Sequence, residues 1–435
     1  MKGACALLTT LPNGLTVIVD EISHVRSVAV GLWVRAGSRY EEASRGGLSH
    51  FLEHMFFKGS ANRTAKQIAE AIDAVGGQLN AFTGKENSCF YCRVLDEHFV
   101  LALDILTDML RNPLFSPEDI ERERNVVLEE INSYEDTPDD LIHDLLLEAF
   151  WEDHPLGRSI LGPAEVVRGF DRPQVLQLYH DRYTPDNLVV AVAGRVDHRA
   201  VLDEVAARLG RMEGRSGPAA ETPPQAAAGR LFRERDSEQV HLCLAGPGLP
   251  ASEDRAFYAA QVLSTMVGGG TSSRLFQRIR EERGLAYSIY TYTSSYRDGG
   301  LMATYAGAGP AQSRQVLDLI LQEMERFRRE GPGDEELERA RAQLKAGVLL
   351  GLESTTNRMM RLGRLQLTLG RQVGPDEVIA RVEAVTRDDV MGVATGALDR
   401  EKLAVAALGP SEALADLDRA VGPGRMAPGA MGGDD

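Results

Sequence analysis

The segment His50-Phe51-Leu52-Glu53-His54 determines how the rest of this chain is interpreted. On a helix, residues four apart lie on the same face, so His50 and His54 can each direct a ring nitrogen at one metal ion. Glu53 projects beside them and can reach a water molecule at that ion. A catalytic zinc site uses three protein ligands and a water. The segment therefore predicts two ligands and a general base, although short motifs of this kind also occur by chance on ordinary helix surfaces.

The bulk composition indicates a soluble globular protein with two large domains. The chain has 435 residues, of which 43% are hydrophobic and 26% are charged. Its formal charge of −16 argues against a nucleic-acid partner and suits a neutral or basic polypeptide. Residues 1–10 contain no apolar run of signal length, and no stretch is long enough to span a membrane. We expect a cytoplasmic protein without membrane contact.

The four cysteines are expected to be reduced structural residues. Cys89 and Cys92 resemble a metal-binding pair, but no second pair exists to complete such a site. They also lie in the strand-like run 88–94, where residues three apart face opposite sides. This small number of cysteines is typical of a protein from a reducing compartment.

The pattern of apolar residues predicts alternating strands and helices. Asn13-Gly14 between two apolar runs is a strong hairpin signal. Strands are expected at 7–11, 15–19, 27–36, 79–82, 88–95 and 188–193, and helices at 46–55, 64–75, 99–111, 118–133 and 198–209. Such a mixture indicates a layered α/β or α+β domain.

The second half of the chain repeats the first. Residues 188–194 read LVVAVAG and residues 403–409 read LAVAALG, an offset of 215. Two further blocks, 120–124 with 337–341 and 164–167 with 375–378, recur in the same order at nearly the same offset. A period of this length indicates a duplicated domain. We expect a metal-binding domain at 1–213, a linker at 214–229, a homologous domain at 230–421 and a disordered tail at 422–435.

The duplication draws attention to one acidic helix. Glu123, Glu129 and Glu130 in the first half align with two alanines and a glycine in the second. The second half also has no counterpart of His50 or His54. The carboxylates therefore occur only in the half that carries the histidines, which links them to the predicted site.

Several motifs together resemble one known family. They are the segments 47–55, 79–83, 122–131 and 183–187. The chain resembles the inverted-zincin metallopeptidases, which include mitochondrial processing peptidase, pitrilysin and insulysin, and looks most like their short bacterial members. The resemblance implies an α+β fold of two homologous domains, each a mixed, mostly antiparallel sheet packed against helices. It further implies a zinc-dependent endopeptidase or oligopeptidase with one Zn2+ per chain.

The resemblance also implies how substrate is handled. Unfolded polypeptides or oligopeptides would bind in extended form within a closed chamber, and the protein would be a homodimer. The alternative is a non-catalytic peptide-binding or scaffold subunit of the same superfamily, but such subunits have degraded zinc motifs.

Roles for individual residues follow from the same resemblance. Glu130 is expected to be the third metal ligand, with the adjacent Glu129 as the alternative. Glu53 is expected to be the general base. Glu123 would orient a ligand or the water, unless it is an arginine-paired surface residue.

A further set of residues is expected to contact substrate. Arg280 and Tyr287 match an arginine–tyrosine pair that contacts substrate near the metal; the alternative is a packing role for both. An extended peptide is expected to pair with the edge strand formed by Leu79, Asn80, Ala81, Phe82 and Thr83. Asp140 and Asp144 match an acidic pair that selects a substrate arginine, although an ordinary solvated helix face is an equal alternative.

Overall fold

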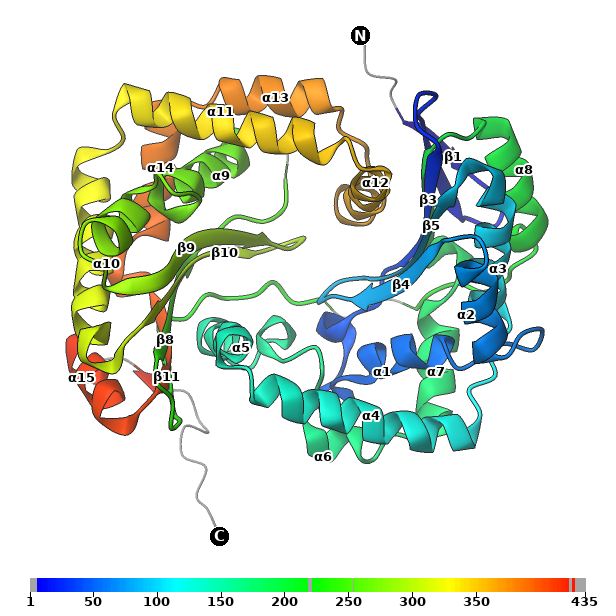
Figure 1. Cartoon of the computed structure of the whole chain (residues 1–435), viewed down its shortest axis with the longest axis horizontal. Helices are drawn as coiled ribbons and strands as arrows, with labels where there is room; N and C mark the ends of the chain where they lie inside the picture. The colour runs from blue at the N-terminus through cyan, green and yellow to red at the C-terminus, as the bar shows by residue number, and fades with distance from the viewer. Residues whose placement is uncertain (1–5, 218–220, 253, 422–424, 427–435) are drawn as a thin grey trace. The chain divides into compact units, whose positions relative to one another are not determined.

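The chain forms two compact units, each built on a mixed six-stranded sheet with helices on both faces (Figure 1). The computed structural model describes residues 6–217, 221–252, 254–421 and 425–426. One strand pair in the first sheet and two in the second are parallel, and the remaining pairs are antiparallel. The predicted α+β class is thereby confirmed.

The units do not follow the linear halves of the sequence. The first consists of Met1–Asn132, Ser159–Glu221 and Leu349–Pro375, and the second of Ser133–Arg158, Thr222–Val348 and Asp376–Asp435. Each half of the sequence thus contributes a segment to the sheet of the other half. The two contributed helices are α12 (Thr355–Leu369), which packs on the first sheet, and α5 (Pro138–Trp151), which packs on the second.

The first unit has the strand order β1-β2-β6-β3-β5-β4. Its strands are β1 (Leu7–Thr10), β2 (Thr16–Glu21), β3 (Ser27–Val34), β4 (Gln78–Thr83), β5 (Ser88–Leu95) and β6 (Leu188–Gly194). Its other helices are α1 (Leu48–Phe56), α2 (Ala65–Asp73), α3 (Phe99–Arg111), most of α4 (Pro117–Glu135), α6 (Ala164–Val167), α7 (Arg172–Arg182) and α8 (His198–Leu209). Because β4 is last in the order, one of its edges is free of strand partners in this sheet.

The second unit has the order β12-β7-β11-β8-β10-β9. Its strands are β7 (Gly229–Glu234), β8 (Val240–Pro247), β9 (Ala286–Ser295), β10 (Gly300–Ala308), β11 (Ala404–Gly409) and β12 (Arg425–Met426). Its other helices are α9 (Arg255–Gly268), α10 (Pro310–Glu330), most of α11 (Asp334–Gly351), α13 (Pro375–Glu383), α14 (Arg387–Ala397) and α15 (Ser411–Val421). The repeated segments 188–194 and 403–409 contain β6 and β11, which are third in their respective orders.

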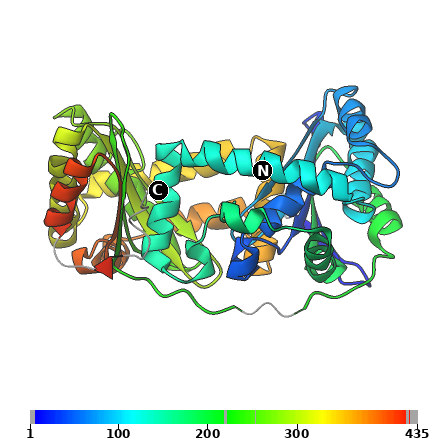
Figure 2. The ribbon, with the colours of Figure 1, turned by 90° about the horizontal axis from the view of Figure 1, so that it is seen from below.

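The elements expected from the sequence agree closely with those observed. Helices α3 and α8 have the predicted bounds, and α2 begins after Thr64, whose side chain forms a capping box with Gln67. Residues 214–217 and 221–228 form no helix or strand (Figure 2). Of the expected tail, only residues 425–426 are described. No helix within the described residues is long and apolar enough to cross a membrane.

Three cysteines are free and buried, in agreement with the prediction, while Cys5 lies outside the described residues. Cys89 and Cys92 face opposite sides of the first sheet, since they belong to two different hydrophobic clusters. Burial raises the pKa of the Cys92 thiol to about 12. These thiols therefore stay protonated and act as small apolar side chains.

Helix α12 packs closely against the first sheet at Trp33. The indole nitrogen donates to the sulfur of Met359 at 3.4 Å. Gly363 lies so near the indole that a Cβ atom there would come within 2.2 Å of the ring nitrogen. The opposite face of the sheet packs against α3 and α8 (Figure 1). The sheet is thus covered on both faces, and α12 depends on a small residue at its contact.

We expect Gly363→Ala to destabilise the protein. The added methyl would collide with the buried Trp33, and such overpacking costs about 1–3 kcal/mol. Gly392→Ala in α14 is the matched control, because nothing lies within 4 Å of its added Cβ. That substitution should be neutral or stabilising by up to about 1 kcal/mol, since alanine favours helices. Urea unfolding followed by tryptophan fluorescence measures both, and equal effects would contradict the packing argument.

Candidate metal centre

Helix α1 presents the predicted metal-binding segment because its apolar residues fix its orientation. Leu48, Phe51, Leu52 and Met55 are almost fully buried in the core of the first unit. Their three- and four-residue spacing makes one continuous apolar face. The remaining face carries the two histidines and the glutamate of the segment. The core therefore sets the direction in which the candidate ligands project.

The start of α1 is held by a carboxylate from upstream. Gly47, the N-cap, has a positive φ of 93° and no side chain to cap the helix. The Glu41 carboxylate instead accepts from the backbone N–H groups of Gly47 at 2.8 Å and Ser49 at 2.5 Å. A Cβ at Gly47 would also come within 2.3 Å of the Leu161 carbonyl oxygen. The position thus requires glycine, and Glu41 replaces the missing cap beside His50.

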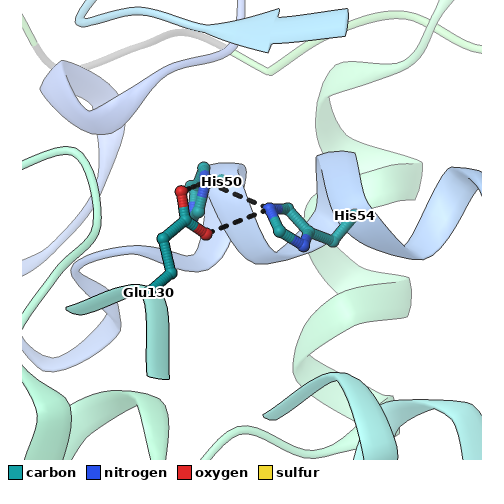
Figure 3. A group of neighbouring side chains, drawn as sticks. All are labelled: His50, His54 and Glu130. Carbon is teal, nitrogen blue, oxygen red and sulfur yellow. Dashed lines mark hydrogen bonds and ion pairs between the residues drawn. The ribbon is translucent and has the colours of Figure 1, made fainter. Parts of the chain in front are cut away.

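Three side chains converge on one point beside α1. The Nε2 atoms of His50 and His54 lie 3.2 Å apart. From α4, the Glu130 carboxylate places one oxygen 3.6 Å from His50 Nε2 and the other 3.4 Å from His54 Nε2 (Figure 3). Among the described residues, this is the group whose ligand atoms lie close enough together to hold a metal ion.

The spacing of these atoms fits a tetrahedral zinc site. Ligands bonded to zinc at about 2.0–2.1 Å in a tetrahedron lie roughly 3.3–3.4 Å from one another. The 3.2 Å between the two Nε2 atoms is close to this value, and each Nε2 lies 3.4 or 3.6 Å from a different oxygen of Glu130. The donor set of two imidazoles and one carboxylate is one that catalytic zinc uses. The residues therefore fit a zinc ion with a fourth position left for water.

Glu123 supports the metal-facing tautomer of His54. Its carboxylate lies 2.9 Å from His54 Nδ1, while its second oxygen accepts from Lys58 Nζ at 2.6 Å. Burial alone would raise the pKa of Glu123, but the hydrogen bonds from His54 and Lys58 lower it. An ionised Glu123 accepts the Nδ1 proton and leaves Nε2 free to bind metal. The alternative of an arginine-paired surface residue is thus not what the structure shows.

His50 lacks such a support. Its Nδ1 atom is buried and has no hydrogen-bond partner within the described part of the chain. The two candidate histidine ligands therefore differ. The Nδ1 atom of His54 is bonded to a carboxylate, and the Nδ1 atom of His50 has no such partner among the described residues.

Glu53 is half-enclosed on the same side of α1. Thr83, at the end of β4, donates a hydrogen bond to its carboxylate at 2.5 Å. Burial raises the pKa of Glu53, and the bond from Thr83 opposes that rise. A carboxylate in this setting has a raised affinity for a proton, which is what a general base requires.

The structure distinguishes the two candidates for the third ligand. Both residues are exposed, but Glu130 joins the histidines and Glu129 is not part of the group. Consecutive helical residues point about 100° apart, so both cannot face the same point. Glu123 and Glu130, two turns apart, share the face that α4 turns toward α1.

The remaining expected residues lie on other elements. Arg280, on the π-helical turn Phe276–Glu281, has its guanidinium carbon 5.3 Å from the Tyr287 ring centroid. Tyr287 is the second residue of β9 and is 79% exposed. Asp140, exposed, and Asp144, half-buried, share α5. These four residues belong to the second unit, and the three candidate ligands belong to the first.

Three supporting residues were not foreseen from the sequence. Lys58 lies four residues beyond His54, so extending the helical spacing by one more turn would have pointed to it. Thr83 was expected only as part of the peptide-binding strand, not as a partner of Glu53. Glu41 gives no periodic signal, because its contact with α1 depends on a loop that doubles back.

Comparison with known proteins finds relatives along most of the chain. The family model described as insulinase (peptidase family M16) matches residues 16–164, and the model described as the peptidase M16 inactive domain matches residues 169–344. The uncharacterized zinc protease YmxG of Bacillus subtilis is 42% identical over 92% of this chain and 98% of its own length. An uncharacterized zinc protease of Streptomyces coelicolor, SCO5738, is 43% identical over 92% of this chain and 89% of its own.

The chain belongs to peptidase family M16. A crystal structure titled as the peptidase M16 inactive domain from Pseudomonas fluorescens superposes with a TM-score of 0.86 at 20% identity, covering 93% of this chain and 98% of that one. A protease from Helicobacter pylori has the same TM-score at 19% identity, covering 93% and 99%. These two superpositions show that the chain shares its fold with both proteins. Within the M16 chain, the candidate ligands all lie in the range of the first family model.

We expect Glu130→Gln to lose zinc. The substitution removes a charged ligand. The loss of zinc affinity should therefore exceed the factor of about 10 to 100 that is typical when a residue supporting a ligand is replaced. Glu129→Gln is the matched control, since it makes the same chemical change one residue away on α4, outside the ligand group. Zinc content after dialysis, and competition with a chromophoric chelator, report the affinity. Equal zinc affinity in the two variants would contradict the ligand assignment.

Proposed function

We propose that this M16 protein is a zinc-dependent endopeptidase or oligopeptidase with one zinc ion per chain. The observation that supports it most is the convergence of His50, His54 and Glu130 at tetrahedral spacing, with Glu53 beside them. The names of its relatives as zinc proteases support the same reaction class. The alternative, a non-catalytic peptide-binding or scaffold subunit, does not account for an intact ligand set with a supporting carboxylate.

In this proposal the protein's own residues move one proton. A zinc ion at this site would polarise the scissile carbonyl and acidify water. Glu53 accepts a proton from the attacking water and then delivers it to the nitrogen of the leaving amine. Glu123 and Lys58 hold His54 in the tautomer that exposes Nε2. Thr83 holds one oxygen of the Glu53 carboxylate and leaves the other to accept the proton.

The substrate would be an extended peptide that adds to the free edge of β4. Backbone pairing of this kind reads few side chains and requires an unfolded segment. The backbone N–H of Ala81 donates to the side chain of Asn80 at 2.8 Å. When the peptide binds, a carbonyl oxygen of the added strand would replace the Asn80 side chain as the acceptor for the N–H of Ala81. The proposed peptide-binding residues are therefore Leu79, Asn80, Ala81, Phe82 and Thr83.

Four residues of the second unit complete the proposal. Tyr287 would donate a hydrogen bond to the negative charge that develops on the carbonyl oxygen, and Arg280 would hold the tyrosine ring. Asp140 and Asp144 would accept a basic substrate side chain.

We also propose a cytoplasmic homodimer that encloses the peptide in a chamber. A mass in solution equal to that of one chain would contradict the dimer.

The catalytic part of the proposal is tested with Glu53→Gln. Removing the base should lower turnover of an internally quenched peptide by about 10²- to 10⁴-fold while zinc content stays at one per chain. The control is the zinc-loaded wild type in the same assay. A zinc-loaded wild type that cleaves no peptide, or a variant that retains full activity, would contradict the proposal.

The contact between Thr83 and Glu53 gives a second test. Thr83→Val keeps the shape of the side chain but removes its donor, so the base loses its restraint and kcat should fall about 10- to 100-fold. Thr83→Ser retains a hydroxyl and should recover most of that loss. KM and zinc content should change little in both variants. If valine and serine lower kcat equally, the hydroxyl is not what positions Glu53.

A further inference from the structure

A shallow pocket lies on the first unit, on the face of the sheet opposite to the metal centre. Its volume is about 410 Å³. It lies where the last strands of the sheet meet α12, and its walls include Trp33, Phe82, Asn87, Met360, Arg361 and Arg364. The proposed mechanism uses none of these side chains for the reaction itself.

The pocket continues a row of side chains that reaches the free edge of the sheet. Phe82 on β4 pairs with Cys89 on β5, and Cys89 pairs with Trp33 on β3. The rings of Trp33 and Phe82 contact edge to face with centroids 5.5 Å apart. Paired residues on neighbouring strands point to the same face of a sheet. This row therefore runs from beneath α12 to β4, at the edge where a peptide strand would be added.

Successive residues of β4 face different partners. Thr83 points toward α1 and contacts Glu53, whereas Phe82 points toward α12. A peptide strand added beside β4 would lie about 4.8 Å away and would alternate in the same manner. Of each two neighbouring peptide side chains, one would face the side of the metal centre. The other would extend the row of Phe82 and meet the pocket.

The chemistry of the pocket selects the kind of side chain that fits. Trp33, Phe82 and Met360 provide apolar walls for methylene groups. Arg364 is exposed on α12, and its guanidinium forms no ion pair or hydrogen bond with any described residue. An arginine pairs well with a carboxylate through two parallel hydrogen bonds. Arg361 adds a second positive charge to the same wall, in a chain whose net charge is −16.

We propose that this pocket is a subsite for an acidic side chain of the substrate, glutamate in particular, with Arg364 as the residue that selects it. The inference rests on the proposed function in one respect, which is that the peptide adds to the free edge of β4. It assigns a preference at a position whose side chain faces away from the metal centre. It is therefore separate from any preference created by Asp140 and Asp144.

The test uses a peptide series in which a single glutamate is moved through each position, with a matched series that carries glutamine. Binding is measured by fluorescence anisotropy to zinc-loaded Glu53→Gln, so that no turnover is needed. At one or more alternate positions, the glutamate peptide should bind about fivefold more tightly than its glutamine match, as expected for a partly exposed ion pair. KM of the active enzyme should follow the same order.

The variants identify the residue responsible. Arg364→Met in the same background should remove the preference, and Arg364→Glu should favour a lysine peptide instead. Arg199→Met is the matched control, because Arg199 is exposed on α8 and does not line the pocket. It should retain the full preference. Circular dichroism checks that each variant is folded.

The outcomes separate the subsite from the proposed function. If no position distinguishes glutamate from glutamine, or if Arg364→Met retains the preference, the subsite is contradicted while peptide cleavage still stands. If glutamate-dependent binding occurs but the wild type cleaves no peptide, the proposed function fails and the subsite stands. If no peptide binds at all, both are overturned.

Discussion

The site depends on one constraint: two imidazoles from one helical turn and one carboxylate from a different helix must meet at tetrahedral spacing. His50 and His54 satisfy their part through the geometry of α1 alone. Glu130 must be brought to them by the packing of α4, which buries Ile120, Val127 and Ile131 in the same core as the apolar face of α1. The hydrophobic core of the first unit is thus what positions the ligands.

The charges of the site also depend on this arrangement. Glu53, Glu123 and Glu130 place three carboxylates close together, and Lys58 compensates for one of them. The two charges left over equal those of one divalent cation. A bound zinc ion would therefore neutralise a cluster that is otherwise costly to gather in a partly buried place. The same excess of negative charge raises the pKa of His54 against the effect of its burial.

Much of this could be predicted from the sequence, and the rest could not for physical reasons. The spacing of His50, Glu53 and His54 is local, so helix geometry alone makes it readable. The repeat showed that Glu123, Glu129 and Glu130 have no acidic counterparts at the aligned positions of the second half. The family resemblance then selected Glu130 as the third ligand. The exchange of α5 and α12 between the units was not foreseen, because helix amphipathicity shows that a face is buried but not against which sheet. The roles of Glu41 and Thr83 depend on loop and strand positions that leave no periodic trace in the sequence.

The most direct test of the central claim is a zinc-edge anomalous difference map from a crystal of the zinc-loaded protein. It should contain one strong peak per chain, about 2.0–2.2 Å from the Nε2 atoms of His50 and His54 and from a carboxylate oxygen of Glu130. A peak bound to other side chains, or no peak in protein shown to contain zinc, would contradict the account.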